Sequence, residues 1–267
     1  YGSLWSGRDS RSGQAARELG VEILGGFTAL QIAVAFGAGL GSAFVRGLTG
    51  FGMAILLVPI LALALPPVEA VVLTNALALM IGATEVKQLV REAESSAWVI
   101  GGLVVLTTPI GLYALSLTGV DIARLVIALI AFSAFIAILL PKRGSAMPGR
   151  LVTGGVGVLS GLMTGYAGMP GPPVVPFYTG RDLPRTTVKA SMLLIFTIAA
   201  TTGLVSATWL GIIRWELLLF AIVLLPVILI GNRLGVAVSG RISDPVWRAS
   251  VGLVLAGAAV GALTRVL

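Results

Sequence analysis

The chain has 267 residues, of which 57% are hydrophobic and 11% are charged, and its mean hydropathy is +1.03. Soluble domains carry about 25% charged residues, so this composition excludes a water-soluble domain and indicates a membrane protein with several spans. The absence of Cys and His excludes disulfides, thiolate nucleophiles and imidazole chemistry, and we attribute the net charge of +7 to orientation in a membrane rather than to nucleic-acid binding.

A polar tail over 1–27 precedes ten apolar segments. A membrane-spanning helix needs about 17–25 residues, and most of the segments qualify, which predicts an all-α membrane protein. Two segments, 51–65 and 170–180, are short and interrupted by Gly and Pro, and the sequence leaves open whether they span the membrane fully or fold back as re-entrant helices. The ten segments lie at 28–45, 51–65, 68–86, 97–118, 123–140, 151–166, 170–180, 187–209, 214–237 and 246–264.

Several uncommon residues recur at one fixed spacing, which indicates an internal duplication. Four pairs of positions each differ by 117 residues: Pro59/Pro176, Pro67/Pro184, Trp98/Trp215 and Pro109/Pro226. This spacing predicts two transmembrane repeats, over 28–149 and 150–267, with about five apolar segments each. Because five is odd, we expect the two repeats to have inverted topology. Three true spans per repeat, with the first two segments re-entrant, would preserve the inversion.

The distribution of positive charge predicts the orientation. If the ten segments alternate across the membrane, twelve of the 18 Lys and Arg residues fall on one side. The other six are Arg8, Arg11, Arg17, Arg124, Arg214 and Arg265. Because Lys and Arg are enriched in cytoplasmic loops, we expect a multi-pass protein of the cell inner (plasma) membrane with both termini outside.

The two interrupted segments are the predicted binding site. The first runs from Arg46 to Gly52, and the second runs from Gly165 to Pro173. Matched broken helices in an inverted repeat are typical of a transporter site at the bilayer midplane. Their N-termini carry unpaired N–H groups and the positive end of the helix dipole, which favour a small anion. The alternative is that these glycines only permit close helix packing.

Five polar side chains near the breaks extend this prediction, each with a structural alternative. Arg46 could grip an anion with two hydrogen bonds, or it could snorkel to the cytoplasmic face. Lys189 could line the pocket, or its charge could help to orient the protein in the membrane. Thr74, Asn75 and Ser191 could donate hydrogen bonds to the anion, or they could form hydrogen bonds between helices. The predicted site comprises Arg46, Gly47, Thr49, Gly50, Phe51, Gly52, Thr74, Asn75, Gly165, Tyr166, Gly168, Gly171, Pro172, Lys189 and Ser191.

The motifs around both breaks resemble those of the TauE/SafE sulfite exporter family. The first reads Arg-Gly-Leu-Thr-Gly-Phe-Gly at 46–52 with Pro59 downstream, and the second reads Gly-Met-Pro-Gly-Pro-Pro-Val-Val at 168–175. The second departs from the commoner Gly-Gly-Pro-Pro form. The resemblance covers about 28–265 and implies an inner-membrane permease for a small sulfur-containing anion such as sulfite, thiosulfate or an organosulfonate like sulfoacetate.

We therefore expect a secondary transporter that works by alternating access. The alternatives are a passive anion channel and a carrier of another small carboxylate or organic metabolite. An intramembrane enzyme is disfavoured because the apolar segments hold no His and no paired acids. We expect no metal, no cofactor and no nucleic-acid partner, only a small anionic substrate and the lipid bilayer. The sequence leaves open the direction of transport, a coupling ion such as a proton or sodium, and a homodimer.

Overall fold

The protein is helical throughout the described residues. The computed structural model describes residues 26–139 and 148–238, and these ranges contain no strand. The helices are α2 (Ala29–Thr49), α3 (Met53–Ala64), α4 (Pro67–Glu92), α5 (Ser95–Leu117), α6 (Val120–Leu139), α7 (Arg150–Ala167), α8 (Gly171–Thr179), α9 (Arg185–Trp209) and α10 (Trp215–Val238). Each predicted segment in these ranges corresponds to one helix, which confirms the all-α prediction. The N-terminal tail up to residue 25 and the predicted segment 246–264 lie outside the described residues.

Five of the described helices are long and apolar enough to cross a membrane. They contain the spans Ala29–Thr49, Pro67–Thr84, Ser95–Leu117, Thr186–Trp209 and Trp215–Val238. By contrast, α3 has 12 residues and α8 has 9. At about 1.5 Å per residue, neither of these short helices covers the roughly 30 Å of a bilayer core.

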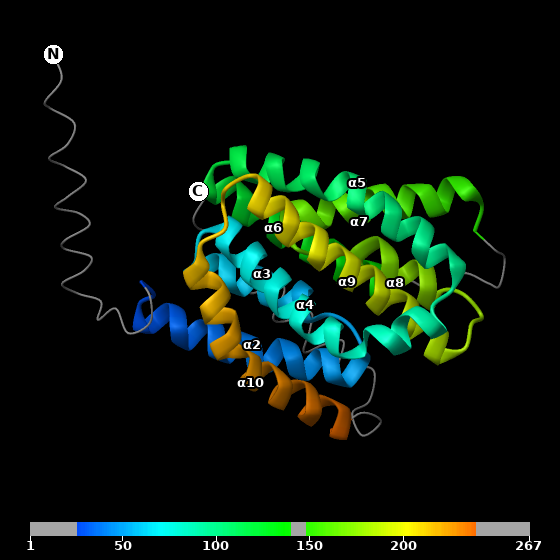
Figure 1. The fold of residues 1–267 in the computed structure, drawn as a ribbon, viewed down its shortest axis with the longest axis horizontal. Helices are drawn as coiled ribbons and strands as arrows, with labels where there is room; N and C mark the ends of the chain where they lie inside the picture. Colours follow the sequence, from blue (N-terminus) through cyan, green and yellow to red (C-terminus); the bar gives the residue numbers. More distant parts are fainter. Residues whose placement is uncertain (1–25, 140–147, 239–267) are drawn as a thin grey trace, which may run out of the picture.

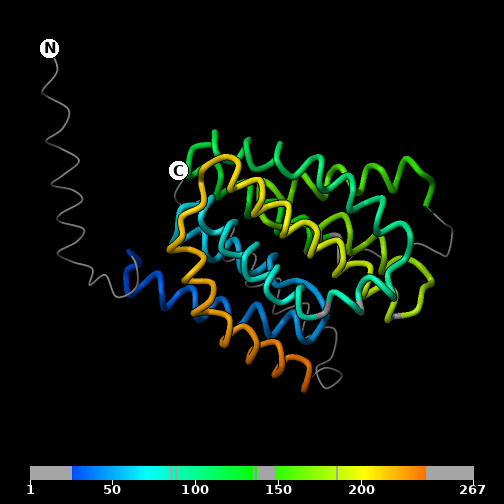
Figure 2. Tube along the Cα trace, viewed as in Figure 1, coloured from blue at the N-terminus to red at the C-terminus, as the bar shows by residue number. Residues whose placement is uncertain are grey.

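The helices are arranged in pairs (Figure 1). α5 and α7 lie side by side along one edge, α2 and α10 lie along the opposite edge, and α4 and α9 run between them. The same order is seen in the Cα trace of Figure 2. The short helix α3 packs on α2, α4 and α6. Leu57, Val58 and Leu61 of α3 are 0–1% exposed, so α3 lies inside the bundle rather than against lipid.

Small residues let the outer pairs approach closely. A Cβ on Gly165 of α7 would lie 2.1 Å from the carbonyl oxygen of Thr108 of α5. On the opposite edge, a Cβ on Gly235 of α10 would lie 2.0 Å from the carbonyl oxygen of Phe44 of α2. Glycine at these positions therefore brings the helix backbones into direct contact, as is common between membrane helices.

The helix pairing supports the predicted repeat. At the 117-residue spacing, α2 corresponds to α7 and α5 corresponds to α10, and the structure pairs α5 with α7 and α10 with α2. The corresponding helices α4 and α9 pack on each other. Asn75 lies against Gly203 and Gly82 against Thr197, so these two helices run antiparallel. Antiparallel packing of these two helices is what inverted halves would give, and the inverted repeat and its orientation in the membrane stay predictions.

Candidate functional site

The first interruption separates α2 from α3. α2 ends at Thr49, and the backbone N–H of Gly50 donates to the carbonyl of Arg46 at 2.7 Å. Gly50 has φ = 85° and Gly52 has φ = 91°. L-residues with a side chain rarely adopt these left-handed values, so glycine is required for the chain to leave α2 and start α3 at Met53.

The second interruption separates α7 from α8. Gly168 has φ = 64°, and its N–H donates to the carbonyl of Thr164 at 2.8 Å. The hydroxyl of Ser160 donates to the carbonyl of Pro170 at 2.8 Å, which ties the connection to α7. A Cβ on Gly168 would lie 3.3 Å from Val58 of α3. The two interrupted elements therefore meet in the interior.

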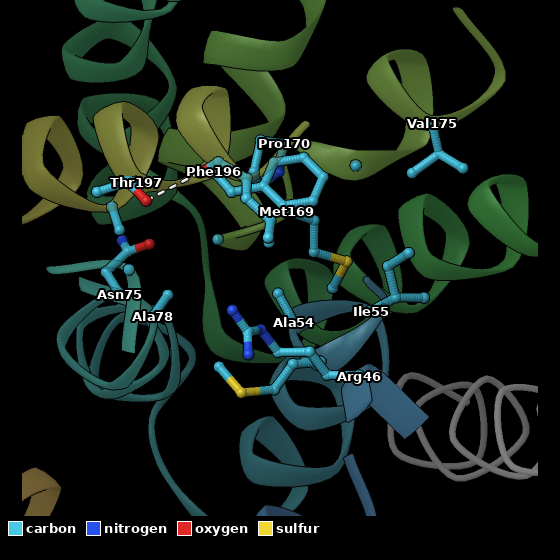
Figure 3. Close-up of a pocket in the computed structure, with 17 residues that line it drawn as sticks. Arg46, Ala54, Ile55, Asn75, Ala78, Met169, Pro170, Val175, Phe196 and Thr197 are labelled. Carbon is cyan, nitrogen blue, oxygen red and sulfur yellow. Dashed lines mark hydrogen bonds between the residues drawn. The ribbon is translucent and has the colours of Figure 1, made fainter. Parts of the chain in front are cut away.

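Both interruptions line one cavity of about 60 Å³ (Figure 3). A water molecule needs about 10–15 Å³ by the same measure, so the cavity has room for a small anion with some water. The α2–α3 side contributes Arg46, Gly52, Met53, Ala54 and Ile55, and the α7–α8 side contributes Gly168, Met169, Pro170, Gly171 and Val175. The central helices complete the wall with Asn75, Ala78 and Gly82 of α4 and Leu193, Phe196, Thr197 and Ala200 of α9.

The cavity has few polar side chains. Figure 3 shows Asn75 and Thr197 on one side of the view, Ile55 and Val175 on the other, and Arg46 between them. The Thr197 hydroxyl donates to the carbonyl of Leu193 at 2.8 Å. The rest of the wall is aliphatic or aromatic, apart from glycines and backbone groups. An apolar lining lowers the local dielectric constant and so strengthens the interaction of an anion with Arg46.

The two helix starts do not offer equal numbers of N–H donors. The first three residues of α3 are Met53, Ala54 and Ile55, and each carries an N–H. In α8 the first three residues are Gly171 and two prolines, so only Gly171 supplies one. The α3 start is thus the stronger electropositive end. The prolines instead fix the backbone of α8 at its first turn.

Arg46 is held from a third helix. Its Nη1 donates to Oδ1 of Asn232 in α10 at 3.1 Å. Arg46 stands in the last turn of α2, where a cation also interacts favourably with the carbonyl end of the helix. The side chain is partly buried and lines the cavity, so it is not a surface arginine.

Of the predicted site residues, the structure brings five together around the cavity: Arg46, Gly52, Asn75, Gly168 and Gly171. Two of the others lie in helix contacts. Gly47 faces the carbonyl of Asn232, which a Cβ would approach to 2.0 Å, and Gly165 faces α5. These two positions match the packing alternative for glycine.

The remaining predicted residues lie close to the interruptions without lining the cavity. The Thr49 hydroxyl bonds within its own turn, to the carbonyls of Val45 and Phe51. Lys189 is exposed, and its aliphatic carbons would lie 3.8 Å from a Cβ on Gly50. Phe51 and Tyr166 are partly buried against the core, and Pro172 is buried at the start of α8.

Thr74 and Ser191 correspond at the 117-residue spacing of the predicted repeat, and they have different environments. The Ser191 hydroxyl accepts a hydrogen bond from the N–H of Glu94 at 2.9 Å. The Thr74 hydroxyl is fully buried and has no hydrogen-bond partner among the described residues. Neither side chain lines the cavity, so their assignment to the anion site stays a prediction.

Sequence reasoning missed most of the cavity wall. The missed residues on α4 and α9 are Ala78, Gly82, Leu193, Phe196, Thr197 and Ala200, and Asn232 was missed on α10. The apolar ones carry no signal of their own, because they resemble any other core residue. Asn232 could have been found, since an amide inside an apolar span is uncommon and points to a specific partner.

A second polar cluster lies where α8 ends and α5 begins. The Arg181 guanidinium donates to both carboxylate oxygens of Glu94, at 2.5 and 2.6 Å. Ser96 also donates to Glu94 at 2.9 Å, and its oxygen lies 2.8 Å from the Tyr178 hydroxyl. Burial alone would raise the pKa of Glu94, but the hydrogen bonds from Arg181 and Ser96 and the Arg181 charge outweigh it, so the pKa lies below its usual value.

Comparison with known proteins covers most of the chain. A family model described as "Sulfite exporter TauE/SafE" matches residues 35–262. A curated relative, the "Probable sulfite/organosulfonate exporter TauE" of Cupriavidus necator, is 27% identical over 79 residues, which is 30% of this chain and 31% of the relative. The matched stretch is thus less than a third of that relative's length. No solved structure matches the chain.

Proposed function

The chain belongs to the TauE/SafE sulfite exporter family, and we propose that it carries a small sulfur-containing anion across the cell inner membrane through the cavity between α3 and α8. The family makes it a membrane transporter rather than an enzyme. Sulfite, thiosulfate and an organosulfonate such as sulfoacetate are the substrates that we propose.

One observation carries this proposal: the starts of both short helices and the side chain of Arg46 line the same cavity. A helix N-terminus presents N–H groups and about half a positive charge to a ligand. A guanidinium adds a full charge and a planar donor pair that matches a sulfonate or sulfite. Three positive elements facing one small apolar cavity favour an anion over a cation or a zwitterion.

The polar and apolar parts of the cavity suit different parts of a substrate. Arg46 and the N–H groups of α3 would bind the oxyanion, replacing its water shell. The side chains of Met169, Phe196 and Val175 would contact an organic body where one is present. Thiosulfate and sulfite would use the polar end alone.

We propose that transport occurs by alternating access. The antiparallel pair of α4 and α9 forms the centre, and movement of one half against the other would open the cavity to each side in turn. For export, an inside-negative potential already favours outward movement of an anion, by about 2.3 kcal/mol per charge per 100 mV. A passive channel on the same scaffold is the competing function.

Ligand-dependent thermal stability tests the proposal. The protein, purified in detergent, is heated with sulfite, thiosulfate, sulfate, sulfoacetate, taurine, acetate or phosphate at matched ionic strength. A ligand that binds the folded state raises the melting temperature by mass action. Selective stabilisation by sulfite, thiosulfate or sulfoacetate is expected, and equal response to all seven would contradict a sulfur-anion site.

Flux measurements then separate a carrier from a channel. In proteoliposomes, a carrier shows saturable uptake of labelled sulfite that is accelerated by unlabelled sulfite inside, because the loaded site returns faster than the empty one. Uptake that rises linearly with concentration and shows no acceleration would favour the channel.

A further inference from the structure

The hydrogen bond between Arg46 and Asn232 joins residues 186 positions apart. Asn232 lies in α10, a helix that is otherwise almost wholly apolar between Glu216 and Arg233. A polar amide within such a span is costly unless it has a specific partner. Its partner here is Arg46, the one cationic side chain among the described residues that line the cavity.

The backbone around Asn232 is fixed against α2. The Asn232 carbonyl oxygen would lie 2.0 Å from a Cβ on Gly47, the residue next to Arg46. One residue before Asn232, a Cβ on Gly231 would lie 2.6 Å from the Leu40 carbonyl, and Gly235 makes a similar approach to Phe44. The Asn232 amide therefore extends from a backbone with little freedom, which makes it a rigid support for the guanidinium.

The helix pair α5–α7 packs closely although neither helix contains an asparagine. At the 117-residue spacing, Asn232 corresponds to Leu115 and Arg46 corresponds to Met163. Leu115 is 1% exposed, and the α5–α7 pair that contains these residues is as closely packed as α2–α10. Close approach of two helices of this kind therefore does not require an Arg–Asn hydrogen bond, so the polar pair in α2–α10 can serve another purpose.

We propose that Asn232 is a positioning residue of the anion site: it orients the Arg46 guanidinium toward the cavity through a neutral acceptor. This role rests on the proposed function. An amide oxygen accepts the same hydrogen bond as a carboxylate but brings no negative charge. A carboxylate at this position would place a negative charge beside the group that attracts the substrate, and so would compete with any bound anion.

The test compares two variants that change the net charge equally. Asn232→Asp and Arg233→Gln each lower the charge by one at adjacent positions, but Arg233 is exposed and does not line the cavity. Dissociation constants for sulfite and sulfoacetate are measured by calorimetry, together with the melting temperature. We expect Asn232→Asp to weaken binding at least tenfold without lowering the melting temperature, and Arg233→Gln to change binding less than twofold.

A second variant keeps the proposal testable if the aspartate does not fold. Asn232→Leu replaces the amide with an apolar side chain of similar size, and we expect it to fold and to bind both anions three- to tenfold more weakly. Wild-type affinity in Asn232→Asp or Asn232→Leu would overturn the role of Asn232 alone. Wild-type protein that binds none of sulfite, thiosulfate and sulfoacetate would overturn the proposed function, and the role of Asn232 with it.

Discussion

Arg181 and Glu94 form a two-pronged ion pair that joins the connection after α8 to the start of α5, with side chains only 9% and 16% exposed. The guanidinium also stands 5.4 Å from the centre of the Phe177 ring. A counterpart lies at the opposite end of α4, where Arg214 bonds Glu69 at 3.0 Å and is 49% exposed. Each pair links the corner before α5 or α10 to a segment far away in the chain. The pair at Glu94 is the more enclosed of the two.

Removing the charge of Glu94 should destabilise the protein. Glu94→Gln leaves Arg181 partly buried beside a neutral amide, at a cost of about 1.5–3 kcal/mol. Thermal unfolding in detergent measures the effect. The matched control is Asp121→Asn, because Asp121 is 55% exposed in its ion pair with Arg124. This substitution should lower the free energy of unfolding by less than about 1 kcal/mol. Equal melting temperatures for the two variants would contradict a stabilising role for the Glu94 pair.

The same pair should make stability depend on acid pH. The pKa of Glu94 is lowered in the folded protein, so the folded state binds this proton less readily than the unfolded chain. The ionised Glu94 therefore contributes its full stabilisation above the pKa of the unfolded chain, about 4.3. This stabilisation is lost as the pH falls through the lower pKa of the folded state. Between pH 6 and pH 3, the melting temperature of the wild-type protein should fall further than that of Glu94→Gln. Parallel pH profiles would show that Glu94 does not contribute to this loss.

Arg46 should matter for binding more than for folding. Arg46→Ala removes the charge and the guanidinium donors at the cavity, and we expect the affinity for sulfite or sulfoacetate to fall at least tenfold, or about 1.4 kcal/mol. Ligand-dependent melting temperature is the measurement, with Arg233→Ala as the control for loss of a nearby exposed cation. An Arg46→Ala protein that binds as tightly as wild type would remove Arg46 from the site.

Gly165 should act through helix packing. In Gly165→Ala the new Cβ would meet the Thr108 carbonyl oxygen at 2.1 Å, so α5 and α7 must separate, at a cost of about 1–3 kcal/mol. Gly155 lies on the same helix with nothing within 4 Å of a Cβ, and Gly155→Ala should be neutral or stabilising by about 0.5–1 kcal/mol. Melting temperatures of the two variants in the absence of ligand give the comparison. A stable Gly165→Ala variant with impaired anion binding would instead support the predicted binding role.

The sequence was most informative about the helices and the interruptions. Long apolar segments predicted the helices closely, since a chain in lipid must satisfy its backbone hydrogen bonds internally. Gly52 and Gly168 were recognisable because left-handed backbone and helix breaks favour glycine. Gly47 and Gly165 look the same in the sequence, yet they lie in helix contacts, because glycine serves both purposes and the pattern does not separate them.

By itself the sequence determined the membrane class, the helical fold and the family, and it predicted an anion site around Arg46. Only the tertiary structure decided which residues share the cavity, because its wall comes from helices far apart in the chain that are mostly apolar there. It also decided that Arg46 meets Asn232 and that Ser191 meets Glu94. Composition and periodicity specify which residues are buried away from water or lipid. The partner of a polar side chain depends instead on how closely the helices approach each other, and glycine contacts set that distance.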